Sequence, residues 1–397
     1  MSREAALLEL VLERNPFHRA RLGKEVPSEL VAIPPLEKRE LVEDQRRNPP
    51  FGTNLTFPLG AYTHVHQTSG TTGPPLRVLD TADDWRWWVS CMATTYRAAD
   101  IGPGDRVALC FSFGPHVQFW DSRDGLEQVG ALAMTLGGMT SVQRLQTIAQ
   151  IGATALVCTP SYALRLYEVA VEENLEDALA SVQKVVCAGE PGASLPAVRA
   201  RIETGLGARV FDHAGLSETG AFGYPCREGG LHLNADEFVC EILGDDLRPA
   251  APGERGELVL TPLGRHGWPV LRYRTGDVVI SPNAQCPAGH QHPWLPGGIV
   301  GRTDDMVVIR GMNVYPSAIE QAVRDVSGSG EFRLTFYREP GGMDEVKLEV
   351  ELGNGSTARA LQDVMRQQLG LRVRVVPVGP GVLPRTEGKA RRVADLR

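Results

Sequence analysis

Short apolar runs alternate with amphipathic segments between residues 106 and 215. The apolar runs predict strands, namely RVALCFSF, GALAMTL, TALVCTP, VQKVVCAG and ARVFDHAG. The segments between them predict helices over residues 118–129, 141–152, 161–174 and 196–206. This alternation is typical of βαβ units around a buried parallel sheet. Ligands of such sheets bind outside the carboxyl ends of the strands, which places CAGEPG and DHAGLSETG on the ligand side.

Helical periodicity dominates the first hundred residues. Apolar positions on one face predict a short helix over residues 4–14 and a second over residues 81–99, capped near Thr81 or Asp83. We expect the large apolar face of the second helix to lie in the core, because helix-spaced apolar residues normally pack inward. That face consists of Trp85, Trp88, Met92 and Tyr96. The stretch between the helices is expected to be rich in loops, since it contains Pro34, Pro35, Pro49 and Pro50.

The pattern changes again after residue 230. The stretches LHLNADEFVCEIL, GELVLTPL and VLRYRTGDVVI alternate between polar and apolar positions and predict a β-rich subdomain. From residue 304 a compact segment combines predicted helices over 316–326 and 357–369 with the strands FRLTFYRE, EVKLEVEL and RVRVVPV. The sequence therefore predicts an α/β fold: a large N-terminal domain, residues 1–303, with a parallel sheet and a β-rich subdomain, and a small α+β domain, residues 304–397.

Composition and charge narrow the class of protein. The 397 residues are 42% hydrophobic and 22% charged, as in ordinary globular proteins, and the net charge of −7 argues against nucleic-acid binding by bulk electrostatics. No apolar run approaches the roughly 20 residues of a membrane span, and Glu9 and Glu13 interrupt the N-terminal segment, so no signal peptide is expected. Seven scattered cysteines form no disulfide framework and predict a reducing, cytoplasmic location. Four of them are expected to be small core residues: Cys91, Cys110, Cys158 and Cys187.

A loop of hydroxyl groups and glycines carries the first sign of chemistry. It comprises Thr68, Ser69, Gly70, Thr71, Thr72 and Gly73. Glycine lets the backbone approach a ligand closely, and hydroxyls with free amides can hold phosphate oxygens. The loop lacks the GK[ST] ending of a Walker A motif. On its own it is equally compatible with a surface turn rich in serine and threonine.

Five stretches in a fixed order favour a phosphate-binding loop over a surface turn. They are TSGTTGPP (68–75), DHAGLSETG (212–220), RYRTGD (272–277), GRTDDMVVIRGMNVYPSAIE (301–320) and LPRTEGKARRV (383–393). From about residue 60 to the end, the chain resembles the adenylate-forming superfamily, and most closely its phenylacetate–coenzyme A ligase branch. The resemblance implies activation of a carboxylate by ATP, release of pyrophosphate, and transfer of the acyl group from acyl-AMP to a thiol.

The resemblance implies roles for the residues around the nucleotide. The hydroxyl loop would hold the β- and γ-phosphates, although Pro74 replaces the lysine that is usual there. Ser217 would contact the α-phosphate and Asp277 the ribose hydroxyls, with Arg302 adding charge nearby. Glu190 would lie at the adenine edge, and Pro191 and Asp212 would also bind the nucleotide. Glu190 alone is also compatible with capping of the next helix.

Catalysis would depend on a few further groups. Glu218 would bind Mg²⁺, because a hard cation prefers carboxylate oxygen. Lys389, in the polar loop near the C-terminus, would stabilise the carboxylate and the α-phosphate together. Asp304 stands at the hinge position of the family, where a few torsions would swing a mobile C-terminal domain between two half-reactions.

The acyl pocket is implied between FSFGPHVQFW and the loop after residue 211. Its wall would include Phe113, His116, Val117, His213 and Ala214. Ala214 stands at the place where the family often has an aromatic residue that stacks on adenine, so the adenine or acyl pocket should differ in shape. His116 is also compatible with a purely structural histidine. An aromatic or arylacetic carboxylate is the default substrate.

A structural metal site is predicted separately. Cys226, His232 and Cys286 offer thiolate and imidazole ligands that suit tetrahedral Zn²⁺. Many relatives carry a second cysteine at the position of Ala288, and here His290 would replace it, with His292 as the alternative fourth ligand. The other interpretation is two unrelated cysteines in a β-rich region.

These observations predict an ATP- and Mg²⁺-dependent ligase that joins an aromatic or arylacetic acid to coenzyme A. One alternative is an acyl-AMP ligase that loads the pantetheine of a carrier protein, or an amine. Another is an inactive nucleotide-binding homologue, supported by Pro74 and Ala214 and opposed by Glu218, Asp277 and Lys389. The expected partners are small molecules or a carrier protein and neither nucleic acid nor membrane. The resemblance also implies a homodimer as one option.

Overall fold

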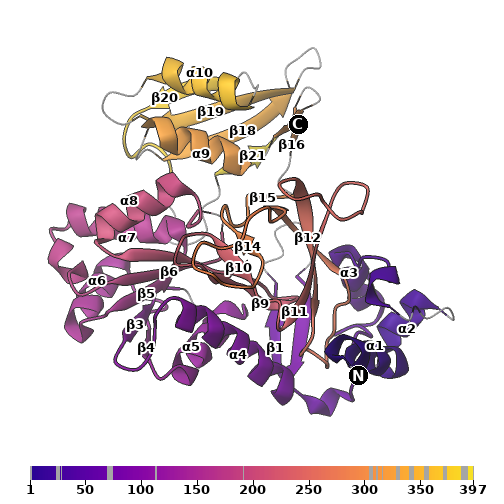
Figure 1. The fold of residues 1–397 in the computed structure, drawn as a ribbon. Helices are drawn as coiled ribbons and strands as arrows, with labels where there is room; N and C mark the ends of the chain where they lie inside the picture. Colours follow the sequence, from indigo (N-terminus) through magenta and orange to yellow (C-terminus); the bar gives the residue numbers. More distant parts are fainter. Residues whose placement is uncertain are drawn as a thin grey trace.

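The computed structural model describes residues 2–23, 27, 29–68, 75–111, 114–190, 192–303, 307–309, 312–314, 316–327, 331–338, 344–352, 357–369, 373–385 and 392–396. Figure 1 shows a small unit, built from the C-terminal elements, above a larger body that contains the rest of the chain. The predicted boundary at Asp304 lies outside the described residues and stays a prediction.

A five-stranded parallel sheet forms the centre of the larger body, in the order β4-β3-β5-β6-β7. Its strands are β3 (Arg106–Leu109), β4 (Leu132–Thr135), β5 (Ala155–Cys158), β6 (Lys184–Cys187) and β7 (Arg209–Asp212). The helices that connect or flank them are α4 (Ala82–Ala98), α5 (Gln118–Gln128), α6 (Ser141–Ile151), α7 (Pro160–Glu172) and α8 (Pro196–Leu206), with the short η3 (Glu176–Leu179). All strand pairs are parallel, as the sequence predicts.

Alternation along each strand explains why both faces of this sheet are covered. Val107 and Leu109 belong to one core cluster, shared with Met92 and Tyr96 of α4. Ala108 belongs to the other cluster, which contains the buried faces of α6, α7 and α8. Successive strand residues point to opposite faces, so a strand that is apolar throughout must have helices on both sides.

The β-rich subdomain consists of two antiparallel sheets, ordered β14-β10-β9-β8 and β11-β12-β13-β15. The first contains β8 (Ala214–Leu216), β9 (Gly220–Pro225), β10 (Leu231–Leu233) and β14 (Trp294–Leu295). The second contains β11 (Phe238–Leu243), β12 (Arg255–Pro262), β13 (Tyr273–Ile280) and β15 (Gly301–Arg302). β8 follows β7 after one residue, so the functional stretch 212–220 passes directly from the parallel sheet into this subdomain.

The small unit is an α+β layer. Its sheet runs β20-β19-β18-β21, with β18 (Phe332–Arg338), β19 (Asp344–Glu351), β20 (Arg374–Val378) and β21 (Val393–Asp395). The helices α9 (Pro316–Ser327) and α10 (Ala358–Leu369) contribute to one core cluster with the sheet, and β16 (Val307–Ile309) pairs with β17 (Met312–Val314). α9 lies against α8 of the larger body.

The N-terminal region is more helical than the sequence pattern predicts. α1 (Arg3–Arg14) confirms the first predicted helix, but α2 (Pro16–Leu22) and α3 (Lys38–Arg47) replace expected loops, together with η1 (Leu30–Ala32) and η2 (Leu59–Ala61). α3 is held by a capping box between Glu37 and Glu40 and by pairs of Glu43 with Arg46 and Arg47. α3 buries a single residue, Leu41, and therefore has no apolar stripe. Hydrophobic periodicity could not predict this helix, because it is stabilised by its cap and its ion pairs.

Other expectations about the core are confirmed. Thr81 caps α4, and the four large residues predicted on its inner face are buried: Trp85, Trp88, Met92 and Tyr96. The four cysteines predicted as core residues are also buried: Cys91, Cys110, Cys158 and Cys187. None of the helices in the described part of the chain combines the length and hydrophobicity that a membrane-spanning segment needs.

Candidate active site

The hydroxyl loop leaves the end of a β-hairpin made of β1 (Tyr62–Gln67) and β2 (Arg77–Thr81). Thr68 is buried, its amide donates to the Leu76 carbonyl, and its hydroxyl accepts a hydrogen bond of 3.0 Å from the Leu76 amide. Thr68 therefore closes the base of the loop instead of facing a ligand with its hydroxyl. The predicted phosphate contacts Ser69, Gly70, Thr71, Thr72 and Gly73 lie outside the described residues.

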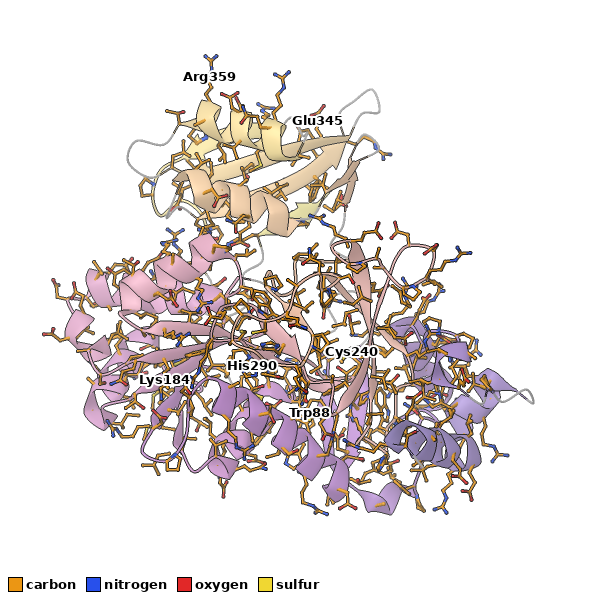
Figure 2. All side chains as sticks on the ribbon, in the orientation of Figure 1. Trp88, Lys184, Cys240, His290, Glu345 and Arg359 are labelled. Atoms are coloured by element: carbon orange, nitrogen blue, oxygen red, sulfur yellow. The ribbon has the colours of Figure 1, made fainter. Side chains whose placement is uncertain are left out.

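A buried arginine fixes the turn that carries Ser217 and Glu218. Nη1 of Arg265 donates to the carbonyl of Ser217 at 3.0 Å and to that of Glu218 at 2.8 Å. The same guanidinium pairs with the buried Asp80 at 2.7 Å and lies 4.8 Å from the ring centroid of Trp88. Figure 2 labels Trp88, which marks this cluster in the fold. Because a charge enclosed in this way is fixed by several partners, Arg265 holds the backbone of the turn rigidly.

The Glu218 carboxylate meets a lysine that the sequence motifs do not include. The Nζ atom of Lys38, at the start of α3, lies 2.9 Å from Oε1 of Glu218. Glu218 also accepts a hydrogen bond from the hydroxyl of Tyr273, whose pKa is raised well above its usual value by burial and by the neighbouring carboxylate. Lys38 belongs to a helix that has no apolar stripe and precedes the recognised motifs, so periodicity could not identify it. One feature of the sequence does point to such a residue. Pro74 stands where the family usually has a lysine, so a cation from elsewhere in the chain could be expected near the phosphates.

Asp277 and Arg302 face each other on neighbouring strands. They are direct partners in the pairing of β13 with β15, and Nη1 of Arg302 lies 2.7 Å from Oδ1 of Asp277. Asp277 is 4% exposed, whereas the Arg302 side chain remains one quarter exposed. Gly276 has φ +76°, and a Cβ there would come within 2.8 Å of the Arg302 guanidinium, so this position needs glycine. The pairing of these strands therefore brings together Asp277, the predicted ribose contact, and Arg302, which is predicted to add charge nearby.

The predicted adenine edge lies at the carboxyl ends of β6 and β7. Glu190 accepts a hydrogen bond of 2.8 Å from the amide of Ser161, so it caps α7, the helix before it, and not the next helix. Asp212 ends β7, where the Ser194 hydroxyl donates to its carboxylate, and burial raises the pKa of Asp212 to about 6. Pro191 lies outside the described residues.

The predicted acyl wall has a mixed environment. His213 donates from Nδ1 to the Gly223 carbonyl at 2.9 Å, and burial lowers the pKa of His213 to about 4, so the ring is neutral near pH 7. Ala214 is buried beside it in β8. His116 donates to the Gln67 carbonyl at 2.9 Å, which ties it to the hairpin. Val117 packs with Trp85, Trp88 and Val89, whereas Phe113 lies outside the described residues.

The predicted metal ligands converge in the β-rich subdomain. The ligand atoms of Cys226, His232 and Cys286 all lie within 4.8 Å of one another, and the two sulfurs are 3.5 Å apart. Nδ1 of His232 donates to the His292 carbonyl, while its buried Nε2 has no hydrogen-bond partner among the described residues. The ring of His290, labelled in Figure 2, has its centroid 4.9 Å from that of His232.

His292 is engaged elsewhere. Its Nδ1 meets the Tyr224 hydroxyl at 3.0 Å, and its Nε2 lies 3.3 Å from an Asp236 carboxylate oxygen. The geometry therefore favours His290 over His292 as the fourth ligand. A histidine that binds a metal through one ring nitrogen usually donates a hydrogen bond from the other. His232 matches this arrangement, since its Nδ1 is hydrogen-bonded and its buried Nε2 has no partner among the described residues.

The remaining predicted residues lie outside the described part of the chain. These are Lys389 in the C-terminal motif and Asp304 at the expected hinge. The described residues on each side of Lys389 include Arg385 and Arg392, and both contact α7 of the larger body. The larger body contains three of the predicted parts of the site. These are the Glu218 turn, the Asp277–Arg302 pair and the strand ends at Glu190 and Asp212.

A parallel-sheet core, a β-rich subdomain and a small C-terminal α+β unit are the parts of an adenylate-forming ligase. Residues 311–397 match the family described as AMP-binding enzyme C-terminal domain. The chain is 30% identical to phenylacetate-coenzyme A ligase of Thermus thermophilus, over 98% of this chain and 94% of the relative. The chain therefore belongs to the phenylacetate–coenzyme A ligase family, whose members are AMP-forming acid–thiol ligases.

Solved structures agree with this assignment. 2-Hydroxyisobutyryl-CoA ligase in the postadenylation state, in complex with R3-HIB-AMP, aligns with a TM-score of 0.90 at 31% identity. The alignment covers 100% of this chain and 88% of that one. The same enzyme in complex with 2-HIB-AMP and CoA in the thioesterification state aligns with a TM-score of 0.73, at 32% identity and over 99% and 88% of the two chains.

Proposed function

We propose that this ligase activates an aromatic or arylacetic carboxylate with ATP and transfers the acyl group to the thiol of coenzyme A. The observation that carries this proposal is the assembly of the Glu218 turn and the Asp277–Arg302 pair beside the carboxyl ends of β6 and β7. Family membership supports the reaction type, and the phenylacetate ligase relative supports the aryl class of acid. The substrate range itself is the finer part of the proposal.

The first half-reaction is attack of a carboxylate oxygen on the α-phosphorus of ATP, with pyrophosphate as the leaving group. In our proposal, Asp277 accepts hydrogen bonds from the ribose hydroxyls, and Ser217 together with Arg302 contacts the phosphate side of the nucleotide. Glu190, Pro191 and Asp212 would line the adenine, and the loop of residues 69–73, whose base Thr68 closes, would hold the β- and γ-phosphates. Lys389 supplies the positive charge that stabilises negative charge developing between the carboxylate and the α-phosphate.

Glu218 fits the role of a magnesium ligand. Its carboxylate is buried, its backbone is fixed by Arg265, and its present partners are a lysine ammonium and a tyrosine hydroxyl. Mg²⁺ bound with ATP would neutralise phosphate charge there. Lys38 can remain beside the phosphates when Glu218 holds the cation, because its long side chain is 41% exposed and adaptable.

The second half-reaction is attack of the coenzyme A thiolate on the acyl carbonyl, with AMP as the leaving group. The higher TM-score to the postadenylation complex than to the thioesterification complex supports a domain arrangement in this structure that resembles the former. We propose that a rotation near Asp304 moves the domain of residues 304–397 between the two arrangements.

We also propose that Cys226, His232, Cys286 and His290 hold a structural zinc ion. The adjacent sulfurs and the free, buried Nε2 of His232 support this donor set. Zinc would join the turn between β9 and β10 to the segment before β14. These residues lie in the β-rich subdomain, so a zinc ion held there would take no part in the reaction steps above.

The first experiment is carboxylate-dependent ATP–pyrophosphate exchange with a panel of aromatic and arylacetic acids, followed by mass detection of products with and without coenzyme A. Exchange together with an acyl–coenzyme A product is the expected result. Exchange without that product would indicate a carrier-protein pantetheine or an amine as acceptor. Absence of exchange with every acid would contradict the proposed function.

A further inference from the structure

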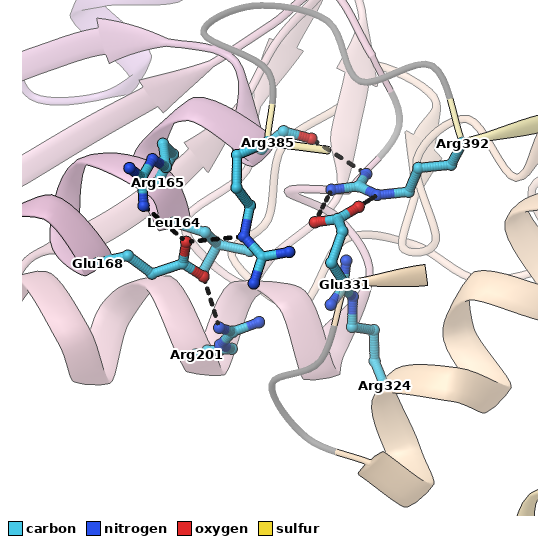
Figure 3. Close-up of a pocket in the computed structure, with 9 residues that line it drawn as sticks. Leu164, Arg165, Glu168, Arg201, Arg324, Glu331, Arg385 and Arg392 are labelled. Carbon is cyan, nitrogen blue, oxygen red and sulfur yellow. Dashed lines mark hydrogen bonds and ion pairs between the residues drawn. The ribbon is translucent and has the colours of Figure 1, made fainter. Parts of the chain in front are cut away.

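Arginines gather where the small C-terminal unit meets α7 and α8 (Figure 3). The residues around this pocket include five arginines and two glutamates: Arg165, Arg201, Arg324, Arg385, Arg392, Glu168 and Glu331. Two of these arginines have a special place in the sequence. Arg385 precedes Lys389 by four positions and Arg392 follows it by three, so they flank the stretch that carries the lysine.

Arg385 connects β19 to α7. Its guanidinium pairs with Glu351 at the end of β19, at 2.7 Å for the closest atoms, within its own unit. On the other side its Nε lies 3.6 Å from Oε2 of Glu168, which belongs to α7 in the larger body. Arg385 is thus held from the C-terminal unit and directed toward α7.

Arg392 makes the corresponding connection on the other side of Lys389. It pairs with Glu331 and lies 3.5 Å from Glu320, both in the C-terminal unit. Its Nη1 donates to the Ser161 hydroxyl on the first turn of α7 at 3.1 Å. The amide of Ser161 donates to Glu190, so a chain of hydrogen bonds leads from Arg392 to the proposed adenine edge.

Glu168 is the negative centre of this interface. It lies within 3.5 Å of Arg165, 3.4 Å of Arg201 and 3.6 Å of Arg385. Burial lowers the pKa of Arg201, and the positive charges of Arg324 and Arg385 lower it further. Without the charge of Glu168, the guanidiniums would repel one another across the interface, because partly buried charges are only weakly screened.

We propose that Glu168 and Ser161 are positioning residues for the first half-reaction. By holding Arg385 and Arg392 against α7, they fix both ends of the stretch with Lys389 while the carboxylate is adenylated. This inference rests on the role proposed for Lys389. It predicts an asymmetry, because a C-terminal domain that moves for thioester formation must leave these contacts on α7. Weakening them therefore slows acyl-AMP formation and leaves thioester formation from supplied acyl-AMP unimpaired.

The test compares Glu168→Gln with Glu172→Gln. Glu172 lies one turn further along the same helix, is 58% exposed and forms an ion pair with Arg165 of the same helix. The two variants therefore lose the same charge, but only Glu168 meets the C-terminal unit. We expect Glu168→Gln to lower ATP–pyrophosphate exchange by about fivefold to tenfold, in line with one or two partly exposed ion pairs. Glu172→Gln should leave both half-reactions close to wild type.

Two further variants separate positioning from a loss of structure. Glu168→Asp keeps the charge and should recover most of the exchange rate. Ser161→Ala removes one hydroxyl and should lower exchange by about threefold to fivefold without changing thioester formation from acyl-AMP. Equal effects of Glu168→Gln on both half-reactions, or equal behaviour of Glu168→Gln and Glu172→Gln, would overturn the inference. A wild-type enzyme inactive in exchange with every acid would instead contradict the proposed function.

Discussion

Lys38 and Glu218 form an ion pair of 2.9 Å between the first turn of α3 and the turn that follows β8. A helix from the N-terminal region therefore supplies a cation at the carboxylate proposed to hold magnesium. The hydroxyl loop has Pro74 where the family usually has a lysine, so it lacks one positive charge. We propose that Lys38, which brings a positive charge to Glu218, takes over the role of that missing lysine.

Replacing Lys38 with methionine should weaken MgATP binding and slow adenylation. The variant keeps the aliphatic stem and removes the charge, and we expect exchange to fall by about tenfold to a hundredfold with a higher KM for ATP. Steady-state exchange at varied ATP measures both quantities. Arg39→Met is the control, because Arg39 is adjacent, 81% exposed and paired with Glu37. If Lys38→Met and Arg39→Met behave alike, Lys38 has no role in nucleotide binding.

Replacing Lys389 with alanine should separate the two half-reactions. Acyl-AMP formation should fall by at least about a hundredfold, because the variant loses the positive charge that we propose to stabilise the carboxylate and the α-phosphate. Thioester formation from supplied acyl-AMP and coenzyme A should persist near the wild-type rate. Rapid-quench measurement of each half-reaction tests this, and equal losses in both would contradict the role of Lys389.

Removing a proposed zinc ligand should lower both the metal content and the stability. Elemental analysis of the wild-type protein should find stoichiometric zinc, and Cys286→Ser should lose most of it. The melting temperature of that variant should fall by at least about 5 °C, since binding of a structural metal contributes directly to folding. Cys240→Ser is the control, because Cys240 lies on β11 outside the cluster. Wild-type protein without zinc would remove the proposal.

Asp212 should make stability depend on pH in a defined direction. Its pKa is raised from 3.8 to about 6 in the fold, so the folded state retains a proton that the unfolded state has lost between these values. The folded state is therefore penalised as pH rises through this window, and the penalty persists above it. Asp212→Asn should be more stable than wild type at pH 8 by about 1–2 kcal/mol, a gain that shrinks toward pH 4.

Chemical denaturation at a series of pH values measures this difference. The exposed Asp246, replaced by asparagine, serves as the control and should change stability little at any pH. A gain for Asp212→Asn that is independent of pH would show that hydrogen bonding to Ser194, and not protonation of the carboxyl, determines the effect.

The sequence predicts most of the parallel core because each strand and helix has its own apolar pattern. The helix over residues 196–206 is found with the predicted bounds, and α4 begins after Thr81 as expected. Predicted strands are longer than observed ones, as in RVALCFSF, where β3 ends at Leu109. Apolar character continues past this strand end, where one more amide, that of Cys110, donates to the Val157 carbonyl of β5, so the apolar pattern extends beyond the assigned strand.

Prediction was weaker where a helix is stabilised by charges. α3 depends on a capping box and on pairs between glutamate and arginine, which leave no apolar stripe. Lys38, on this helix, was missed for that reason. The Arg265–Asp80 pair was missed as well, because its members lie far apart in the sequence and only the fold makes them neighbours. Asp277 and Glu218 stand in short motifs that carry the family resemblance, so the sequence alone singles them out, and their roles stay predictions.

The last strand has a consequence for Lys389, the lysine that we propose to be catalytic. β21 pairs in parallel with β18, and the Leu334 amide donates to the Arg392 carbonyl at 2.7 Å. A lysine on a free tail would explore a large volume, whereas a stretch with both ends fixed to one sheet has a small effective volume and a high local concentration at its target. Pairing of β21 with β18 therefore fixes the chain on the C-terminal side of Lys389 to the sheet. A chain that ends at residue 392 would lack β21. The entropic cost of adenylation should then rise, although none of the residues proposed to contact ATP is removed.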